Sequence, residues 1–233
     1  MKNPFRTLTP FERTLWITSL IVVSASFILS PDRDILSLIA SLIGVTALLF
    51  VAKGYVLGQI LTVVFAVFYG ILSYPQAYYG EMLTYLGMTA PMAILAAISW
   101  FLHPYRDTME VTVSRLSHRK ILWLLALTTL TTIGFYFLLR ALGTADLPLS
   151  TLSVTTSFLA SALTFLRSPY YALGYAANDV VLILLWILAS ARDISSLPMV
   201  FCFVMFLAND LYGFVNWRRM QRKQFGNKSG FSM

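Results

Sequence analysis

The sequence has few charges and a single cysteine. Only 12% of its 233 residues are charged and 58% are hydrophobic, whereas soluble domains carry about 25% charged and about 45–50% apolar residues. A soluble protein of this length could not bury so much apolar surface, because part of its side-chain area must face water. The cysteine, Cys202, lies in an apolar run. A disulfide framework or a cysteine-based metal site within one chain is therefore excluded.

The sequence also lacks the motifs of enzymes. It contains no H-E-x-x-H helix, no G-x-S-x-G turn, no glycine-rich phosphate loop and no cluster of cysteine and histidine. We therefore expect no catalytic residue, no metal site and no cofactor. The net charge of +7 does not indicate a nucleic-acid partner, because basic residues gather in the cytoplasmic loops of membrane proteins.

Long apolar runs fill most of the chain. About 20 apolar residues span a hydrocarbon core of roughly 30 Å, and strands of a membrane barrel would alternate over about ten positions instead. The sequence therefore predicts an all-α integral membrane protein with eight transmembrane helices, in which the lipid bilayer is the solvent. The predicted segments are 14–30, 34–52, 55–75, 82–103, 120–141, 149–167, 170–190 and 196–217.

The basic residues predict the orientation. If all eight segments span and the N-terminus is cytoplasmic, 14 of the 17 basic residues lie inside, and only Arg33, Arg140 and Arg192 lie outside. This asymmetry follows the positive-inside rule. We therefore expect both termini in the cytoplasm, and a basic, disordered tail after Trp217.

The second to fourth segments resemble the sixth to eighth. An offset of 116 places Ser41–Phe50 on Ser157–Leu166 and Gly58 on Gly174, and one further residue places Trp100 on Trp217. Equivalent segments are four apart along the chain, an even number, so both copies insert the same way. This predicts a parallel 3+1+3 repeat, with the first helix as an extra one. The expected divisions are 1–33 (N-terminal segment and extra helix), 34–103 (first repeat), 104–148 (cytoplasmic loop and linker helix), 149–219 (second repeat) and 220–233 (basic cytoplasmic tail).

Ionisable residues within spans carry the functional signal, because an unpaired charge in hydrocarbon costs several kcal/mol. Asn178-Asp179 and Asn209-Asp210 are two such pairs. At 1.5 Å per residue, Asn178 lies roughly 13 Å from Pro169, and Asn209 lies roughly 13 Å from Arg218. Pairs at one depth favour a binding site, and the alternative is interhelical hydrogen bonding.

Within several predicted segments, further polar and aromatic residues lie together on one face of the helix. Aromatic faces stack on a flat ring, and amides bind hydroxyl and carboxamide groups. This combination predicts a nucleoside-like substrate. The candidate substrate-binding residues are Gln59, Thr62, Tyr69, Tyr171, Tyr175, Asn178, Asp179, Asn209, Asp210, Tyr212 and Asn216.

Residues 34–220 resemble the PnuC family of bacterial vitamin transporters. The similarity is best at Tyr79–Leu83 and Leu211–Arg219. The resemblance implies a trimer in the bacterial inner membrane that carries an unphosphorylated solute by facilitated diffusion, followed by trapping through a cytosolic kinase. Family members for nicotinamide riboside typically carry W-x-x-W-x-x-x-N, where this chain has Tyr171, Gly174 and Asn178.

The leading hypothesis is therefore uniport of a nucleoside-like solute. Nicotinamide riboside is the first candidate, and another nucleoside such as a deoxynucleoside is the second. Proton-coupled transport of a vitamin of the thiamine or riboflavin type, through Asp179 or Asp210, is an alternative within transport. A membrane scaffold or receptor that transports nothing is the alternative from another class.

Overall fold

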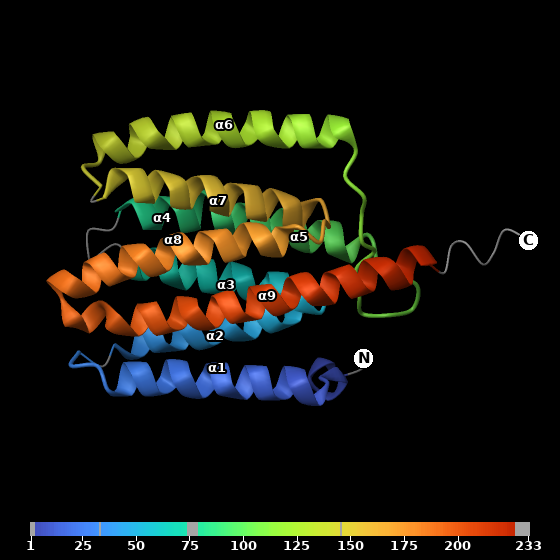
Figure 1. The fold of residues 1–233 in the computed structure, drawn as a ribbon, viewed down its shortest axis with the longest axis horizontal. Helices are drawn as coiled ribbons and strands as arrows, with labels where there is room; N and C mark the ends of the chain where they lie inside the picture. Colours follow the sequence, from blue (N-terminus) through green and yellow to red (C-terminus); the bar gives the residue numbers. More distant parts are fainter. Residues whose placement is uncertain (1–2, 33, 74–78, 145, 227–233) are drawn as a thin grey trace, which may run out of the picture.

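The computed structural model describes residues 3–32, 34–73, 79–144 and 146–226, and within them it is a bundle of roughly aligned helices (Figure 1). These residues contain no β-strand, only two isolated bridges. The all-α prediction is confirmed. The elements are η1 (Pro4–Thr7), α1 (Pro10–Ile28), α2 (Ile35–Ala52), α3 (Val56–Ser73), α4 (Tyr79–Thr84), η2 (Tyr85–Thr89), α5 (Ala90–Phe101), α6 (His118–Ala141), α7 (Leu147–Phe165), α8 (Tyr171–Arg192), η3 (Ile194–Ser196) and α9 (Leu197–Gly226).

The helices match the eight predicted segments. Within the described residues, seven helical stretches are long and apolar enough to cross a membrane, and α3 adds a shorter apolar helix. The fourth segment is interrupted, because Pro91 lacks the N–H that would bond to the carbonyl of Gly87. The π-helical turn η2 lies directly before this proline and widens the helix.

Two buried tryptophans join the two halves reciprocally. Trp100 of α5 donates its indole N–H to the Thr164 carbonyl at the end of α7 (3.0 Å). Trp217 of α9 donates to the Val51 carbonyl at the end of α2 (2.9 Å). Their ring centroids are 5.2 Å apart. A tryptophan of each half thus donates a hydrogen bond to the C-terminal end of a helix in the other half. A parallel repeat allows this arrangement.

The structure aligns the first helices of the two repeats, α2 and α7, differently from the sequence prediction. Helices α2 and α7 both end at a left-handed residue, Gly54 (φ 69°) and Arg167 (φ 57°), as helix C-termini commonly do. These positions are 113 residues apart. The predicted alignment of Ser41–Phe50 with Ser157–Leu166 is therefore wrong by three residues, close to one helical turn. The loop between α7 and α8 is two residues longer than the loop between α2 and α3 and accounts for two of these three residues.

The outer helices α1 and α6 lie at opposite edges of the bundle (Figure 1). Helix α1 packs against α2 and α9, whereas α6 packs against α7. Only Leu124, Thr128 and Leu139 of α6 are buried. Apolar side chains on the rest of α6 are suited to lipid, which is as apolar as they are.

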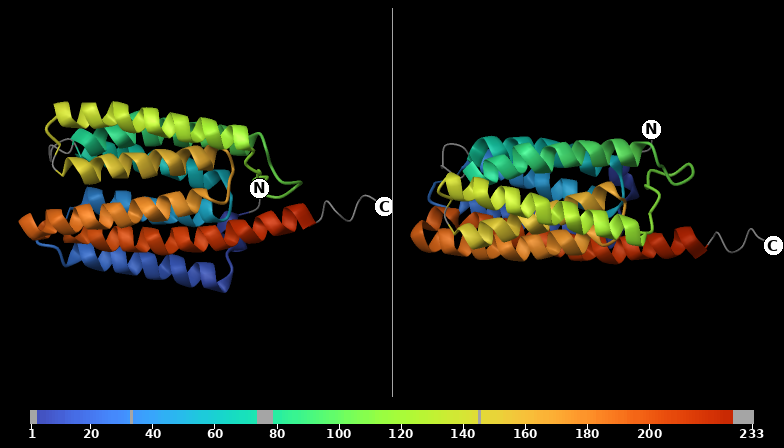
Figure 2. Two further views of the ribbon diagram at one scale, coloured as in Figure 1. Left: turned by 45° about the horizontal axis from the view of Figure 1, so that its top comes forward. Right: turned by 90° about the horizontal axis from the view of Figure 1, so that it is seen from above.

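Most basic residues lie at the end of the bundle where α1 begins and α9 ends, which we call the basic end. Helix α9 continues to Gly226 and reaches past the other helices there (Figure 2). The predicted disorder after Trp217 is therefore wrong for this stretch. The described basic residues at this end are Arg6, Arg13, Lys53, Arg106, Arg115, Arg119, Lys120, Arg167, Arg218, Arg219, Arg222 and Lys223.

Candidate functional site

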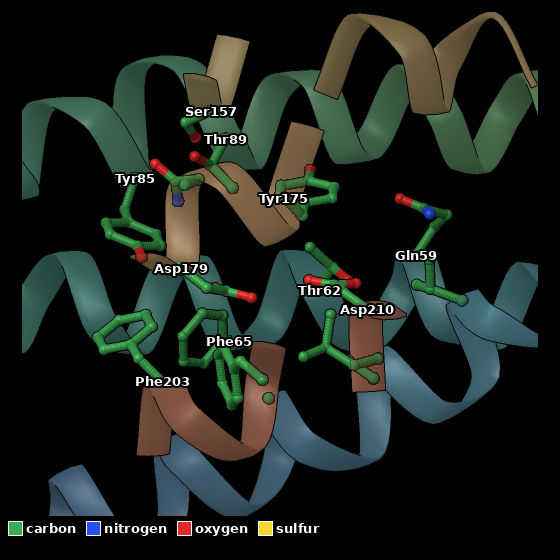
Figure 3. Close-up of a pocket in the computed structure, with 16 residues that line it drawn as sticks. Gln59, Thr62, Phe65, Tyr85, Thr89, Ser157, Tyr175, Asp179, Phe203 and Asp210 are labelled. Carbon is green, nitrogen blue, oxygen red and sulfur yellow. The ribbon is translucent and has the colours of Figure 1, made fainter. Parts of the chain in front are cut away.

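A cavity lies between the two halves, bounded by α2, α3 and η2 on one side and by α7, α8 and α9 on the other (Figure 3). Its empty volume is about 620 Å³, including its opening. No Lys, Arg or His is among the described residues that line it. The polar lining consists of Gln59, Thr62, Thr89, Ser157, Tyr175, Asn178, Asp179 and Asp210, and the remainder of Gly44, Ala47, Leu48, Val51, Phe65, Tyr85, Phe203 and Phe206.

Two carboxyl groups meet in this cavity. Asp179 of α8 and Asp210 of α9 are each 3% exposed, and both carboxyl groups line the same cavity. Two neighbouring carboxyl groups do not readily ionise together, so the pair carries at most one negative charge. Neither forms an ion pair with any described residue, and Asp179 Oδ2 is buried without a hydrogen-bond partner there.

Four aromatic rings form one wall. Phe65 of α3 packs edge-on against Tyr85 of η2 (centroids 5.8 Å apart) and Phe206 of α9 (5.7 Å), and Phe203 adjoins Phe206 (5.4 Å). The π-helical turn places both Tyr85 and Thr89 in the lining. Such rings can stack on a flat ligand and can hold a cation against their faces.

Polar side chains of α8 and α3 complete the lining, and those of α8 are held by hydrogen bonds to α7. Asn178 Oδ1 accepts hydrogen bonds from Ser153 (3.1 Å) and Thr156 (2.9 Å) of α7. Its NH2 group has no hydrogen bond to a described residue and is available as a donor in the cavity. The Tyr175 hydroxyl shares a hydrogen bond with Ser161 (3.0 Å). The buried amide of Gln59 also has no hydrogen-bond partner among the described residues.

The structure brings six of the eleven candidate residues together in the cavity, namely Gln59, Thr62, Tyr175, Asn178, Asp179 and Asp210. Two pairs of these cavity residues are separated by the predicted repeat offset of 116. Gln59 of α3 corresponds to Tyr175 of α8, and Thr62 corresponds to Asn178. Both halves therefore contribute equivalent positions to one site.

Three candidates on α9 face away from the cavity. Asn209, Tyr212 and Asn216 lie on one face, as their spacing predicted, but that face contacts α1 and the end of α2. Asn209 donates to Ser19 (3.1 Å), Tyr212 donates to Glu12 (2.6 Å), and Asn216 donates to the last carbonyl of α2 (2.9 Å). These bonds join α9 to its neighbours.

The other two candidates lie behind the cavity walls. Tyr69 packs against Tyr85, with centroids 4.4 Å apart. Tyr171 is completely buried and packs against Trp217 (4.9 Å). A Cβ atom on Gly213 would lie 3.0 Å from the Tyr171 hydroxyl. The Tyr171 hydroxyl therefore occupies space that is free because Gly213 has no side chain.

A third buried acid lies near the basic end and has a full set of partners. Glu12 is 2% exposed, and Lys53 Nζ lies 2.9 Å from both of its carboxylate oxygens. The Tyr212 hydroxyl and the Thr9 backbone N–H donate to it at 2.6 and 2.7 Å. This cluster joins α1, α2 and α9.

Sequence reasoning missed six of the described residues that line the cavity with a polar or aromatic group. Phenylalanine is so common in membrane spans that Phe65, Phe203 and Phe206 gave no signal. Pro91 was the available clue to the π-helical turn that positions Tyr85 and Thr89. The sixth residue is Ser157 of α7, an unremarkable hydroxyl in the sequence.

Comparison with known proteins identifies the family. A family model described as nicotinamide mononucleotide transporter matches residues 34–219. The chain belongs to this family. It is 28% identical, over 94% of this chain and 84% of the other, to a nicotinamide riboside transporter PnuC of Neisseria mucosa. It is 24% identical to a protein of the same name from Haemophilus influenzae, over 92% of each chain.

A solved structure supports the same assignment to the PnuC family. The crystal structure of the vitamin B3 transporter PnuC matches 93% of this chain and 94% of its own, with a TM-score of 0.81 and 26% identity. The predicted PnuC resemblance is therefore confirmed. Because the named family members are transporters, the prediction that the chain is not an enzyme is confirmed as well.

Proposed function

We propose that this PnuC-family protein carries nicotinamide riboside across the membrane by facilitated diffusion. The observation that carries the proposal is the buried carboxyl pair Asp179 and Asp210, in a cavity that no described basic side chain lines. The pyridinium ring of nicotinamide riboside has a fixed positive charge. One negative charge in a buried site complements one positive charge on the ligand.

The remaining lining suits the other parts of this molecule. The rings of Phe65, Tyr85 and Phe206 offer faces for the pyridinium, through stacking and cation–π attraction. The Asn178 NH2 group and the Gln59 amide offer hydrogen bonds to the carboxamide and the ribose hydroxyl groups. Both curated relatives named above are nicotinamide riboside transporters by name, which agrees with this assignment.

The aromatic wall also accounts for the missing tryptophans of the family pattern. A Cβ atom on Gly174 would lie 2.9 Å from the Ala160 backbone, so α7 and α8 pack too closely for a larger side chain at that place. Tyr171 is packed against Trp217 behind the wall. We propose that Phe65, Tyr85, Phe203 and Phe206 take over the stacking role.

Binding of three ligands to the purified protein tests the proposed substrate. We expect nicotinamide riboside to bind at least about tenfold more tightly than a neutral deoxynucleoside, which corresponds to about 1.4 kcal/mol. We expect nicotinamide mononucleotide to bind more weakly still, because its phosphate adds about −1.5 to −2 charge next to the carboxyl pair. Equal binding of riboside and mononucleotide would contradict the proposal.

The orientation and the assembly are proposed with it. Every described basic residue except Arg140 and Arg192 is at the basic end, and this favours a cytoplasmic location for that end and for both termini. We propose the bacterial inner membrane as the location and a homotrimer as the assembly, with phosphorylation in the cytosol trapping the substrate. Labelling of an introduced cysteine at Arg222, from one side of sealed vesicles, tests the orientation.

Proton-coupled transport is a second candidate, and one observation favours it. Two buried carboxyl groups that line one cavity can hold a proton, which a substrate cation could displace. Uptake into proteoliposomes with and without an imposed pH gradient separates the candidates. Facilitated diffusion predicts accumulation only to the level expected from concentration and membrane potential, whereas coupling predicts accumulation that follows the pH gradient.

A further inference from the structure

A second cavity lies at the basic end, apart from the one between the halves. It is formed by the segment that leads into α6, the loop between α7 and α8, and the last turns of α9, with an empty volume of about 1280 Å³ including its opening. Arg115, Arg218 and Arg222 line it, and no Asp or Glu is among its described lining residues. We call it the arginine cleft.

Neighbouring side chains hold two of these arginines. Arg218 Nη1 donates to Gln221 Oε1 (2.8 Å), and its guanidinium lies 5.8 Å from the ring centre of Tyr170. The Arg115 guanidinium lies 4.3 Å from the ring centre of Phe225. A guanidinium held by its flat face keeps its N–H edge available for a ligand.

The two sides of the cleft are fixed to one another. Gln224 of α9 is 4% exposed. Its Oε1 accepts from the Val113 N–H (2.8 Å) and its Nε2 donates to the Val111 carbonyl (3.1 Å). The next residue, Ser114, donates its backbone N–H to the Arg167 carbonyl (2.9 Å). The cleft is therefore part of the folded structure and not a gap beside a loose basic tail.

The positive charge of the cleft has no partner within the described residues. The ion pairs at the basic end are Glu12 with Lys53 and Glu110 with Lys223, and none involves an arginine of the cleft. In the adjoining loop, Arg167 Nε is buried and has no hydrogen-bond partner there. Three guanidinium groups line one cavity without an acid, and they concentrate positive charge there.

We propose that the arginine cleft binds a phosphate group. Guanidinium groups bind phosphate oxygens in pairs of hydrogen bonds, and several together bind one phosphate strongly. The phosphate has two possible sources, namely the headgroup of an anionic phospholipid in the adjoining leaflet or a soluble phosphate compound. This site is separate from the substrate cavity, and the proposal does not depend on which solute is transported.

The test compares two triple variants of the full-length protein in detergent. The variant R115Q/R218Q/R222Q removes the arginines of the cleft. The control R119Q/R219Q/K223Q removes the same charge from exposed neighbours that do not line it. Binding of phosphatidylglycerol, phosphatidylcholine and inorganic phosphate is measured by native mass spectrometry and calorimetry. We expect at least about tenfold weaker binding of the phosphate ligand to the cleft variant, and less than about twofold weakening in the control.

The ligands separate the two sources, and the variants decide the proposal. A preference for phosphatidylglycerol over phosphatidylcholine that the cleft variant loses indicates a headgroup, and binding of inorganic phosphate that it loses indicates a soluble ligand. Equal losses in both triple variants, or no phosphate ligand bound by the wild type, overturn the proposal. Should the cleft variant not fold, Arg222→Gln and Arg219→Gln, both at exposed positions, replace the two triples.

Discussion

Among the described residues, carboxyl groups are buried in two places, and their partners differ. Glu12 has a lysine, a tyrosine and a backbone N–H within 2.9 Å, so its charge is fully compensated. Asp179 and Asp210 have one another and no described cation. A compensated acid holds helices together, as Glu12 joins α1 to α2 and α9. An uncompensated pair beside a cavity is suited to a cation that arrives and leaves.

This contrast predicts that a change near Glu12 alters stability, whereas a change in the cavity alters binding. The largest effect is expected for Lys53→Met. Breaking a buried ion pair from one side costs about 3–5 kcal/mol, because the remaining charge is buried without a partner. We expect a clearly lower unfolding temperature in detergent.

The double variant E12Q/K53M serves as the control for that change. It leaves no unpaired charge, so it should recover much of the lost unfolding temperature. Binding of nicotinamide riboside to either variant, measured below its unfolding temperature, should stay within about twofold of wild type. A loss of affinity as large as that of a cavity variant would contradict the division into a structural and a functional acid.

The next effect is expected for the double variant D179N/D210N. This change removes both carboxyl groups, and with them any charge of the pair, while keeping the shape of the side chains, so affinity for nicotinamide riboside should fall about 10–100-fold, or about 1.4–2.8 kcal/mol. The unfolding temperature should not fall, since buried ionisable groups have been removed. Asp193→Asn, at an exposed position after α8, is the control and should bind like wild type. Unchanged affinity in D179N/D210N would exclude the carboxyl pair from recognition.

A smaller effect distinguishes two asparagines at similar depth. Asn178 lines the cavity, whereas Asn209 bonds to Ser19 and to the Met205 carbonyl. We expect Asn178→Ala to weaken binding by about fivefold, the loss of roughly one hydrogen bond. Asn209→Ala should lower stability by about 1 kcal/mol and leave affinity unchanged. Calorimetry and thermal unfolding of both variants give the answer, and identical profiles would contradict the placement of the two side chains.

Much of the fold was predictable because apolar length determines where a chain crosses a membrane. The continuation of helix α9 beyond Trp217 was not predictable. The side chain that holds it is Gln224, which forms hydrogen bonds with residues more than a hundred positions earlier. The register between α2 and α7 was missed for another reason. An extra two residues in a loop change no apolar pattern, so sequence similarity among small apolar residues gave an alignment one turn away.

The site was predictable in part. The two Asn-Asp pairs lie at the depth where polar groups gather. Adjacent helical residues point about 100° apart, so the two members of a pair need not share a partner. Both Asn178 and Asp179 line the cavity, whereas only Asp210 of the second pair does. When both residues are polar, the sequence does not indicate which of them faces the cavity. The packing of α1 against α9 decides it, because Ser19 takes Asn209 and leaves Asp210 to the cavity.

The most direct test of the central claim compares nicotinamide riboside with its reduced, uncharged dihydropyridine form. The two differ by a hydride and by one positive charge. Calorimetry with the wild-type protein should show at least about tenfold tighter binding of the charged form, and the double variant D179N/D210N should bind both forms about equally. Equal binding by the wild type, or a preference for the charged form that survives in the double variant, would contradict the claim that the carboxyl pair selects a cation.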